Sequence, residues 1–168
     1  MAPTLPAPIP VPFVSKPMHV EPGWIDLNGH MNLAYYQVLF DRNFDDVLAF
    51  AGFGPDYLAK TDHSIFAGEV HICYRREVRL EDPVTISWRL LGADDKRLHF
   101  YSEMHHASEG WLAAVSENIS LHVDMAARRV APFQPGAVAM LQRIAEAHAA
   151  LPTPNLIGRR IAMPARPA

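Results

Sequence analysis

The chain has 168 residues, the length of one ordinary domain, so it can bury a core without a disulfide or a structural metal. Its 49% hydrophobic and 20% charged residues are typical of globular proteins, and a formal net charge of −3 gives no electrostatic reason to expect nucleic acid as a partner. One cysteine, Cys73, excludes an internal disulfide, and no apolar run approaches the ~20 residues of a membrane helix. We therefore expect a soluble, cytoplasmic protein with no membrane partner.

Prolines are concentrated at the two ends of the sequence. They occupy positions 3, 6, 8, 10 and 12 at the start, and positions 152, 154, 164 and 167 at the end. Because proline fixes φ and lacks an N–H donor, both ends should be irregular. We predict an N-terminal arm over residues 1–12, a domain over 13–150 that includes a C-terminal helix, and a tail over 151–168.

The first elements of the predicted domain are a strand and a long helix. Residues 13–20 have strand character, with a bend expected at Pro17. Asn32 is a typical N-cap, and a helix is predicted from Leu33 until Gly52, Gly54 and Pro55 end it. Its apolar residues recur at spacings of three and four: Tyr36, Phe40, Phe44, Val47, Leu48 and Ala51.

The pattern then changes to the period of two that strands show. We predict strands in residues 65–80, 84–91, 97–106 and 111–124, with GADDK and ASEG as hairpin turns, and a final helix in 137–151. In the first of these strands Phe66, Val70, Ile72, Tyr74 and Val78 should share a face. In the last strand Glu117 interrupts an apolar face. This order predicts an α+β fold in which one curled antiparallel sheet wraps a single long helix.

Polar residues gather just before the long helix, in the stretch WIDLNGHMN. They are Asp26, Asn28, Gly29, His30 and Asn32. Such residues are ordinary in caps and tight turns. The start of a helix also offers free backbone N–H groups and the positive end of its dipole, which suits a site for a developing negative charge.

The pattern D-x-x-G-H-x-N between a first strand and a long helix resembles the hot-dog-fold acyl-CoA thioesterases of the hydroxybenzoyl-CoA type. The stretches WIDLNGHMNLAYY, FDR at 40–42, KRLH at 96–99 and HVDMAARRVAPF at 122–133 are similar to carnitinyl-CoA or betainyl-CoA thioesterases in particular. Many relatives carry a second acid two positions before Asp26, where this chain has Trp24.

The resemblance implies a catalytic role for the polar stretch in hydrolysis of an acyl-CoA thioester to an acid and CoA. Asp26 would act as general base or as carboxylate nucleophile, and the N–H near Leu33 would polarise the thioester carbonyl. Gly29 would let backbone approach the ligand closely, while Asn28, His30 and Asn32 would orient water or the carbonyl.

A trimethylammonium acyl group would need aromatic faces and a carboxylate. The aromatic candidates are Trp24, Tyr35, Tyr36 and Phe66, although Tyr36 is better explained as core packing. The carboxylate candidates are Glu69 and Glu117; for Glu117 a buried pair with Arg or His is the favoured alternative. Candidates for binding the phosphates of CoA are Lys96, Arg97, Arg128 and Arg129.

We expect no metal and no cofactor beyond the CoA of the substrate. The nine histidines form no recognisable ligand set: His71 and Cys73 share one strand face, and His99, Glu103 and His105 share another. The open edge of such a sheet, together with the resemblance, predicts a homodimer or homotetramer. Two alternatives are a hot-dog hydratase, whose Asp and His lie farther apart than Asp26 and His30, and a non-catalytic acyl-CoA-binding protein.

Overall fold

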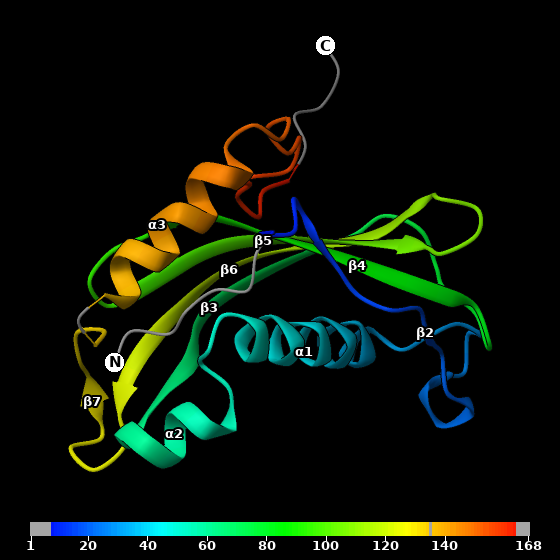
Figure 1. Cartoon of the computed structure of the whole chain (residues 1–168). Helices are drawn as coiled ribbons and strands as arrows, with labels where there is room; N and C mark the ends of the chain where they lie inside the picture. Colours follow the sequence, from blue (N-terminus) through cyan, green and yellow to red (C-terminus); the bar gives the residue numbers. More distant parts are fainter. Residues whose placement is uncertain (1–7, 135, 164–168) are drawn as a thin grey trace.

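The computed structural model describes residues 8–134 and 136–163, and its centre is one antiparallel sheet curled over a long helix (Figure 1). The elements are β1 Phe13–Val14, β2 Met18–His19, a 3-10 turn Pro22–Trp24, α1 Leu33–Phe50, α2 Pro55–Thr61, β3 His63–Tyr74, β4 Pro83–Ala93, β5 Arg97–His106, β6 Leu112–Asp124, β7 Arg129–Val130 and α3 Ala137–His148. The strand order is β1-β4-β5-β6-β3. The predicted α+β arrangement is confirmed; most of the predicted arm (1–7) and the end of the tail (164–168) lie outside the described residues.

Local sequence explains where the first elements begin and end. Pro17 divides the predicted first strand into β1 and β2, which both pair with β4. The side chain of Asn32 accepts a hydrogen bond from the Ala34 N–H at 3.0 Å and so caps α1, as predicted. Gly52, with φ +77°, follows the end of the helix. The short elements α2 and β7 were not predicted.

Helix α1 lies against the concave face of the sheet, and apolar side chains pack around both of its ends (Figure 1). Near its start, Tyr36 and Leu39 pack with Met31, Ile86 and Met104. Near its end, side chains of α1, β4, β5 and α3 form a second cluster that includes Val47, Phe53, Trp88, Leu90, Phe100, Leu141 and Ile144. These clusters fix the helix to the sheet at both ends of the site described below.

The predicted shared face of the first long strand is wrong, because β3 contains a bulge. Its pairing with β6 shifts between Ala67 and Glu69, so Phe66 lies on the opposite face from Val70. Gly68 lies in a tight place at this point, since a Cβ there would lie 3.1 Å from Leu121 Cγ and 3.3 Å from the Ile119 carbonyl oxygen. The sequence prediction assumed an uninterrupted period of two across Gly68 and therefore assigned Phe66 to the wrong face.

Strand β6 also turns a different face toward α1 than its apolar pattern suggested. Asn118 and Ser120 line a cavity against the helix, so Glu117 and Ile119, which alternate with them, point to the other face of the sheet. The inward face of this strand is polar: Ser116, Asn118, Ser120 and His122 are all buried. Apolar content alone did not identify the covered side.

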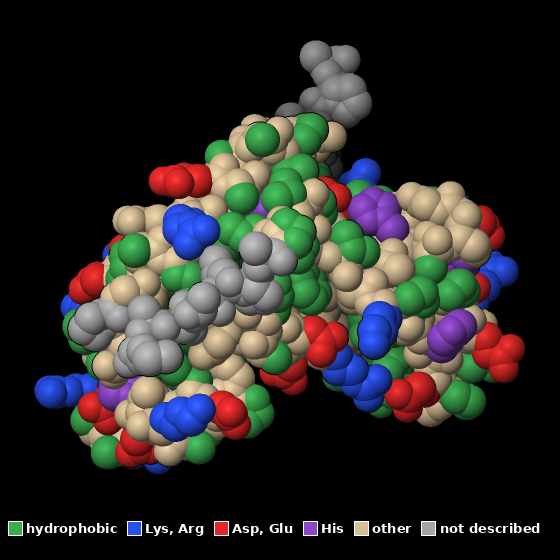
Figure 2. Space-filling model, in the orientation of Figure 1, with side chains coloured by type: hydrophobic (Ala, Val, Ile, Leu, Met, Phe, Trp, Pro, Cys, Tyr) green, Lys and Arg blue, Asp and Glu red, His purple; other side chains and the backbone are tan. Residues whose placement is uncertain are grey.

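The two edges of the sheet differ. At one edge, the His148 ring of α3 accepts a hydrogen bond from the Leu90 N–H at 3.0 Å and donates one to the Pro10 carbonyl at 2.8 Å. At the other edge, β3 pairs with β6 on one side and with no strand of the described residues on the other. Acidic and basic side chains are interspersed over the face shown in Figure 2. None of the described helices is long and apolar enough to cross a membrane.

Candidate active site

A tight loop carries the polar stretch to the start of α1. The Gly29 N–H bonds to the Asp26 carbonyl at 3.0 Å, and the Asp26 N–H bonds to the His30 carbonyl at 3.1 Å. Gly29 has φ +80°, a backbone conformation that favours glycine, which gives this residue a conformational role. The Asn32 N–H bonds to the Trp24 carbonyl at 2.9 Å and closes the loop. The loop therefore holds Asp26 beside the helix start with main-chain hydrogen bonds.

The Asp26 carboxylate is held on one oxygen only. Its Oδ1 accepts a hydrogen bond from the Asn28 N–H at 2.8 Å, and His30 Nδ1 lies 3.9 Å from the same oxygen. Among the described residues nothing donates to Oδ2. The side chains of Asp26 and His30 are 21% and 33% exposed, so water or a substrate can reach them. This arrangement suits a carboxylate that removes a proton from water or attacks directly.

The first N–H of α1 is available where the helix follows the loop that carries this carboxylate. The Asn32 side chain satisfies the Ala34 N–H, whereas within the described ranges no group accepts from the Leu33 N–H. The Tyr74 hydroxyl donates to the Leu33 carbonyl at 3.3 Å and ties β3 to this turn. The Leu33 N–H is a donor at the positive end of a helix dipole, which is suited to an oxyanion.

The predicted aromatic candidates are already engaged with one another. Trp24, 7% exposed, stacks on Tyr35 with ring centroids 5.1 Å apart, and the Arg42 guanidinium lies 5.0 Å from its ring centroid. The Tyr36 hydroxyl accepts a hydrogen bond from the Val78 N–H at 3.2 Å, and burial raises the pKa of this phenol. Tyr36 thus packs in the core, and the Trp24 ring has an intramolecular cation beside it.

The other predicted substrate residues lie away from the helix. Phe66, Glu69 and Glu117 point to the face of the sheet opposite α1. Glu117 accepts hydrogen bonds from His99 Nε2 at 2.9 Å and from the Gly158 N–H at 2.6 Å. A pair with Arg or His was the favoured alternative to substrate binding for Glu117 in the sequence analysis, and the partner is His99. Glu69 lines the same outer pocket, together with His71 and Arg159.

The turns after β4 and β6, which carry the predicted phosphate-binding residues, lie at the end of the sheet near α2 and β7, whereas the segment between β2 and α1, which carries Asp26, lies at the other end (Figure 1). Lys96 is 3.7 Å from Asp95, and Arg97 is 2.6 Å from Asp94. Arg128, in the turn after β6, and Arg129, the first residue of β7, are exposed. Within one chain these four residues are therefore not brought together with Asp26.

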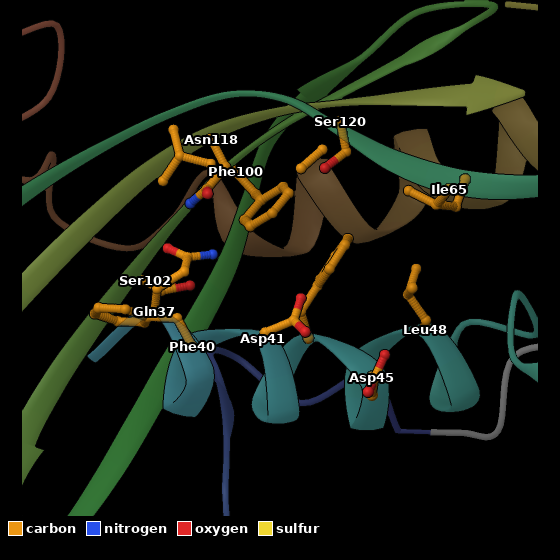
Figure 3. A pocket seen from close by; sticks show the side chains of 13 residues that line it. Gln37, Phe40, Asp41, Asp45, Leu48, Ile65, Phe100, Ser102, Asn118 and Ser120 are labelled. Atoms are coloured by element: carbon orange, nitrogen blue, oxygen red, sulfur yellow. The ribbon is translucent and has the colours of Figure 1, made fainter. Parts of the chain in front are cut away.

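A cavity of about 90 Å³ lies between α1 and the concave face of the sheet, and sequence reasoning missed it (Figure 3). Polar side chains lining it are Gln37, Asp41, Asp45, Ser102, Asn118 and Ser120, and its aromatic walls are Phe40, Phe44 and Phe100. A signal was present in the sequence: Ser116, Asn118 and Ser120 repeat with the period of a strand face. No group of three or more potential metal ligands forms in the parts that the structure describes.

Comparison with known sequences places this chain among thioesterases. The family model of the thioesterase-like superfamily matches residues 20–143. A betainyl-CoA thioesterase of Pseudomonas aeruginosa is 37% identical over 145 residues, which cover 86% of this chain and 91% of that protein. An L-carnitine dehydrogenase/betainyl-CoA thioesterase of Rhizobium meliloti is 35% identical over 142 residues, which cover 84% of this chain but 28% of that longer protein.

Solved structures share the fold. A Staphylococcus aureus protein in complex with CoA superposes with a TM-score of 0.85 at 24% identity, over 95% of this chain and 99% of that one. A provisionally assigned thioesterase from Pseudomonas putida gives a TM-score of 0.77 at 31% identity, over 92% and 98% of the two chains. The predicted hot-dog fold is confirmed. The chain belongs to the thioesterase-like superfamily and is a thioesterase, as the resemblance predicted.

Proposed function

We propose that this thioesterase hydrolyses CoA esters of small acyl groups that carry a trimethylammonium cation, with Asp26 as the catalytic carboxylate. The observation that supports the proposal is the hydrogen-bonded loop that holds the partly exposed Asp26 carboxylate just before α1, where no described group accepts from the Leu33 N–H. The similarity to a betainyl-CoA thioesterase over most of both chains supports the acyl class. The product pair is the free acid and CoA.

The proposed reaction uses the helix start for the carbonyl and Asp26 for the nucleophile. The carbonyl oxygen accepts from the Leu33 N–H, so negative charge that develops on it is stabilised by this donor and the helix dipole. As general base, Asp26 takes a proton from the attacking water, the C–S bond breaks, and the proton passes to the leaving thiolate. As nucleophile, Asp26 attacks the carbonyl carbon, the C–S bond breaks and CoA leaves as the thiolate, and water then hydrolyses the acyl–Asp26 anhydride to the free acid and the Asp26 carboxylate. His30, close to Asp26 Oδ1, positions the water.

The proposed working unit is a homodimer. Three large apolar side chains of β3 are substantially exposed in one chain: Phe66 at 47%, Val70 at 39% and Tyr74 at 47%. They accompany a strand edge that no described strand covers. Pairing of two β3 edges would cover both features and would bring residues of a second chain to the groove beside α1. Light scattering after gel filtration tests this, and a monomer that hydrolyses thioesters would contradict it.

A panel of CoA esters tests the proposed reaction. The panel contains betainyl-, carnitinyl-, acetyl-, hydroxybenzoyl- and octanoyl-CoA, and release of the CoA thiol is followed with a thiol reagent. We expect kcat/KM to be highest for the two trimethylammonium esters. Preference for a neutral acyl group would be consistent with thioesterase activity but would reject a trimethylammonium ester as the preferred substrate. Absence of hydrolysis across the panel would reject the proposal as a whole.

A further inference from the structure

One buried oxygen on the second turn of α1 has no hydrogen-bond partner within the described chain. Gln37 Oε1 is buried, and no described residue donates to it. Within the described ranges Asn43 and Trp88 also have buried polar atoms without a partner, but neither of them lines the cavity between α1 and the sheet, whereas Gln37 does. An unpaired buried acceptor is costly, so Gln37 Oε1 is suited to a donor from outside the chain.

Gln37 lies between this cavity and the start of the helix. In an α-helix the Gln37 N–H donates to the Leu33 carbonyl, and the Tyr74 hydroxyl of β3 donates to that same carbonyl at 3.3 Å. Gln37 is about 6 Å along the axis from Leu33, and a helical side chain covers the turn on the N-terminal side of its own Cα. The Gln37 side chain therefore extends from the cavity toward the turn whose first N–H has no described acceptor.

The cavity has the size and the polar lining that bound water requires. Its volume is about 90 Å³, and one water needs roughly 10–15 Å³ together with two to four polar partners. Gln37, Ser102 and Asn118 lie at one end of the cavity, and Leu48 and Ile65 lie at the other (Figure 3). We therefore expect water at the end where Gln37 lies, because the polar partners are there.

The Asp26 carboxylate supplies a second acceptor without a donor. Its Oδ1 accepts from the Asn28 N–H at 2.8 Å, whereas no described residue donates to its Oδ2. A water molecule has two hydrogens, so one water can donate to Asp26 Oδ2 and to Gln37 Oε1 together. Both lone pairs of that water then remain free, one to attack a carbonyl carbon and the other to accept a hydrogen bond from His30.

We propose that Gln37 is a positioning residue that holds the hydrolytic water against Asp26. This inference rests on the proposed function and adds to it the group that orients the attacking water. In the general-base form of the reaction, a lone pair of the water oxygen forms the bond to the thioester carbon and one water proton passes to Asp26. The C–S bond then breaks, and that proton moves on to the leaving thiolate. Gln37 Oε1 accepts from the other O–H and so fixes the direction of the attacking lone pair.

Substitution of Gln37 tests the proposal by separating kcat from KM. Gln37→Leu removes the acceptor, so with the panel ester that the unmodified protein hydrolyses fastest we expect kcat to fall about tenfold and KM to stay within about twofold. Gln142→Leu is the matched control, since it makes the same change at an exposed position of α3 and should alter neither constant. An unchanged kcat in Gln37→Leu would overturn the proposal, and a rise in KM alone would also overturn it, because Gln37 would then bind substrate.

Competition between water and methanol separates positioning of the water from a loss of folded protein. Methanol as nucleophile gives the methyl ester, but its hydroxyl has one hydrogen and cannot donate to Asp26 and Gln37 together. In Gln37→Leu water loses this advantage, so the initial ratio of methyl ester to free acid at a fixed methanol concentration should rise about tenfold. This ratio does not depend on the amount of folded enzyme. An unchanged ratio would overturn the proposal, whereas no hydrolysis of any panel ester by the unmodified protein would reject the proposed function itself.

Discussion

Carboxylates lie on both sides of the sheet, Glu117 on its outer face and Asp41 and Asp45 on α1 beside its inner face, and their surroundings differ. On the outer face, Glu117 accepts hydrogen bonds from His99 and from the Gly158 N–H, so its charge is satisfied within the chain. On the inner face, Asp41 and Asp45 border a cavity in which Gln37 Oε1 lacks a donor. An unpaired buried polar group costs free energy, and a bound water or ligand that donates to it offsets that cost. The chain itself thus satisfies the outer carboxylate of Glu117, whereas it leaves the inner amide oxygen of Gln37 without a donor.

The largest expected effect is on kcat, and it compares Asp26, in the loop before α1, with Glu117 on the outer face of the sheet. Asp26→Asn should lower kcat by about a hundredfold or more, because the amide can neither accept the proton of water nor attack the carbonyl. Glu117→Gln keeps the shape of the outer pair and should change kcat less than threefold. Steady-state thiol release with the preferred ester measures both. A larger loss in Glu117→Gln than in Asp26→Asn would assign the chemistry to the outer face.

A second substitution tests the bulge at Gly68, which places Phe66 and Val70 on opposite faces of β3. Gly68→Val should destabilise the fold by about 1–3 kcal/mol, because the new side chain meets Leu121 and the Ile119 carbonyl. Gly92→Ala is the matched control, since nothing lies within 4 Å of a Cβ at that site. Urea unfolding followed by circular dichroism gives the free energies of unfolding. Equal stability of both variants would mean that the bulge tolerates a side chain.

The cost of the unpaired inner polar group can be measured directly. Gln37→Leu removes the buried oxygen that lacks a donor and keeps much of the side-chain volume. The free energy of unfolding should rise by about 0.5–1 kcal/mol while kcat/KM for the preferred ester falls. Urea unfolding and thiol release on the same preparation measure the expected rise in the free energy of unfolding and the expected fall in kcat/KM. A less stable variant would show that Gln37 already contributes to folding.

The smallest expected effect concerns a satisfied polar residue of the same inner face. His122 is buried, its Nδ1–H donates to the Ala131 carbonyl and its Nε2 accepts from the Tyr57 hydroxyl. Burial lowers the pKa of His122 below its ordinary value. Below pH ~6.5 the unfolded chain therefore binds a proton that the folded chain resists, so the stability that the neutral ring gives is present above that pH and is lost as pH falls through the folded pKa.

Unfolding in urea at pH 7, 6 and 5 measures this dependence. The free energy of unfolding should fall toward pH 5 in the unmodified protein. It should fall less in His122→Gln, which has no group to titrate at that position. His148, whose pKa burial also lowers, remains in both proteins and accounts for part of the common slope. Identical slopes would show that His122 is not responsible.

Short-range signals were sufficient for the elements and for the catalytic loop. The Asn32 cap, the glycines after α1 and the turns GADDK and ASEG are local, so the sequence predicted α1, the four long strands and the position of Asp26 at a helix start. The faces of the strands depend on long-range pairing. The bulge at Gly68 is set by Leu121 on another strand, and the polar inner face of β6 is covered by α1 across the sheet. For this reason the cavity residues were missed.

The hydrogen bonds of His148 have a consequence for how the protein can polymerise. A sheet with two free edges can add further copies indefinitely, as fibres do. Here β1 and β2 pair with β4, and the ring of His148 engages its main chain at Leu90, so the described part of the chain presents β3 as its one long bare edge. When two such edges meet across a twofold axis, neither copy retains a free strand for a third. In the proposed dimer, β1, β2 and His148 together would therefore keep the β4 edge from adding a third copy.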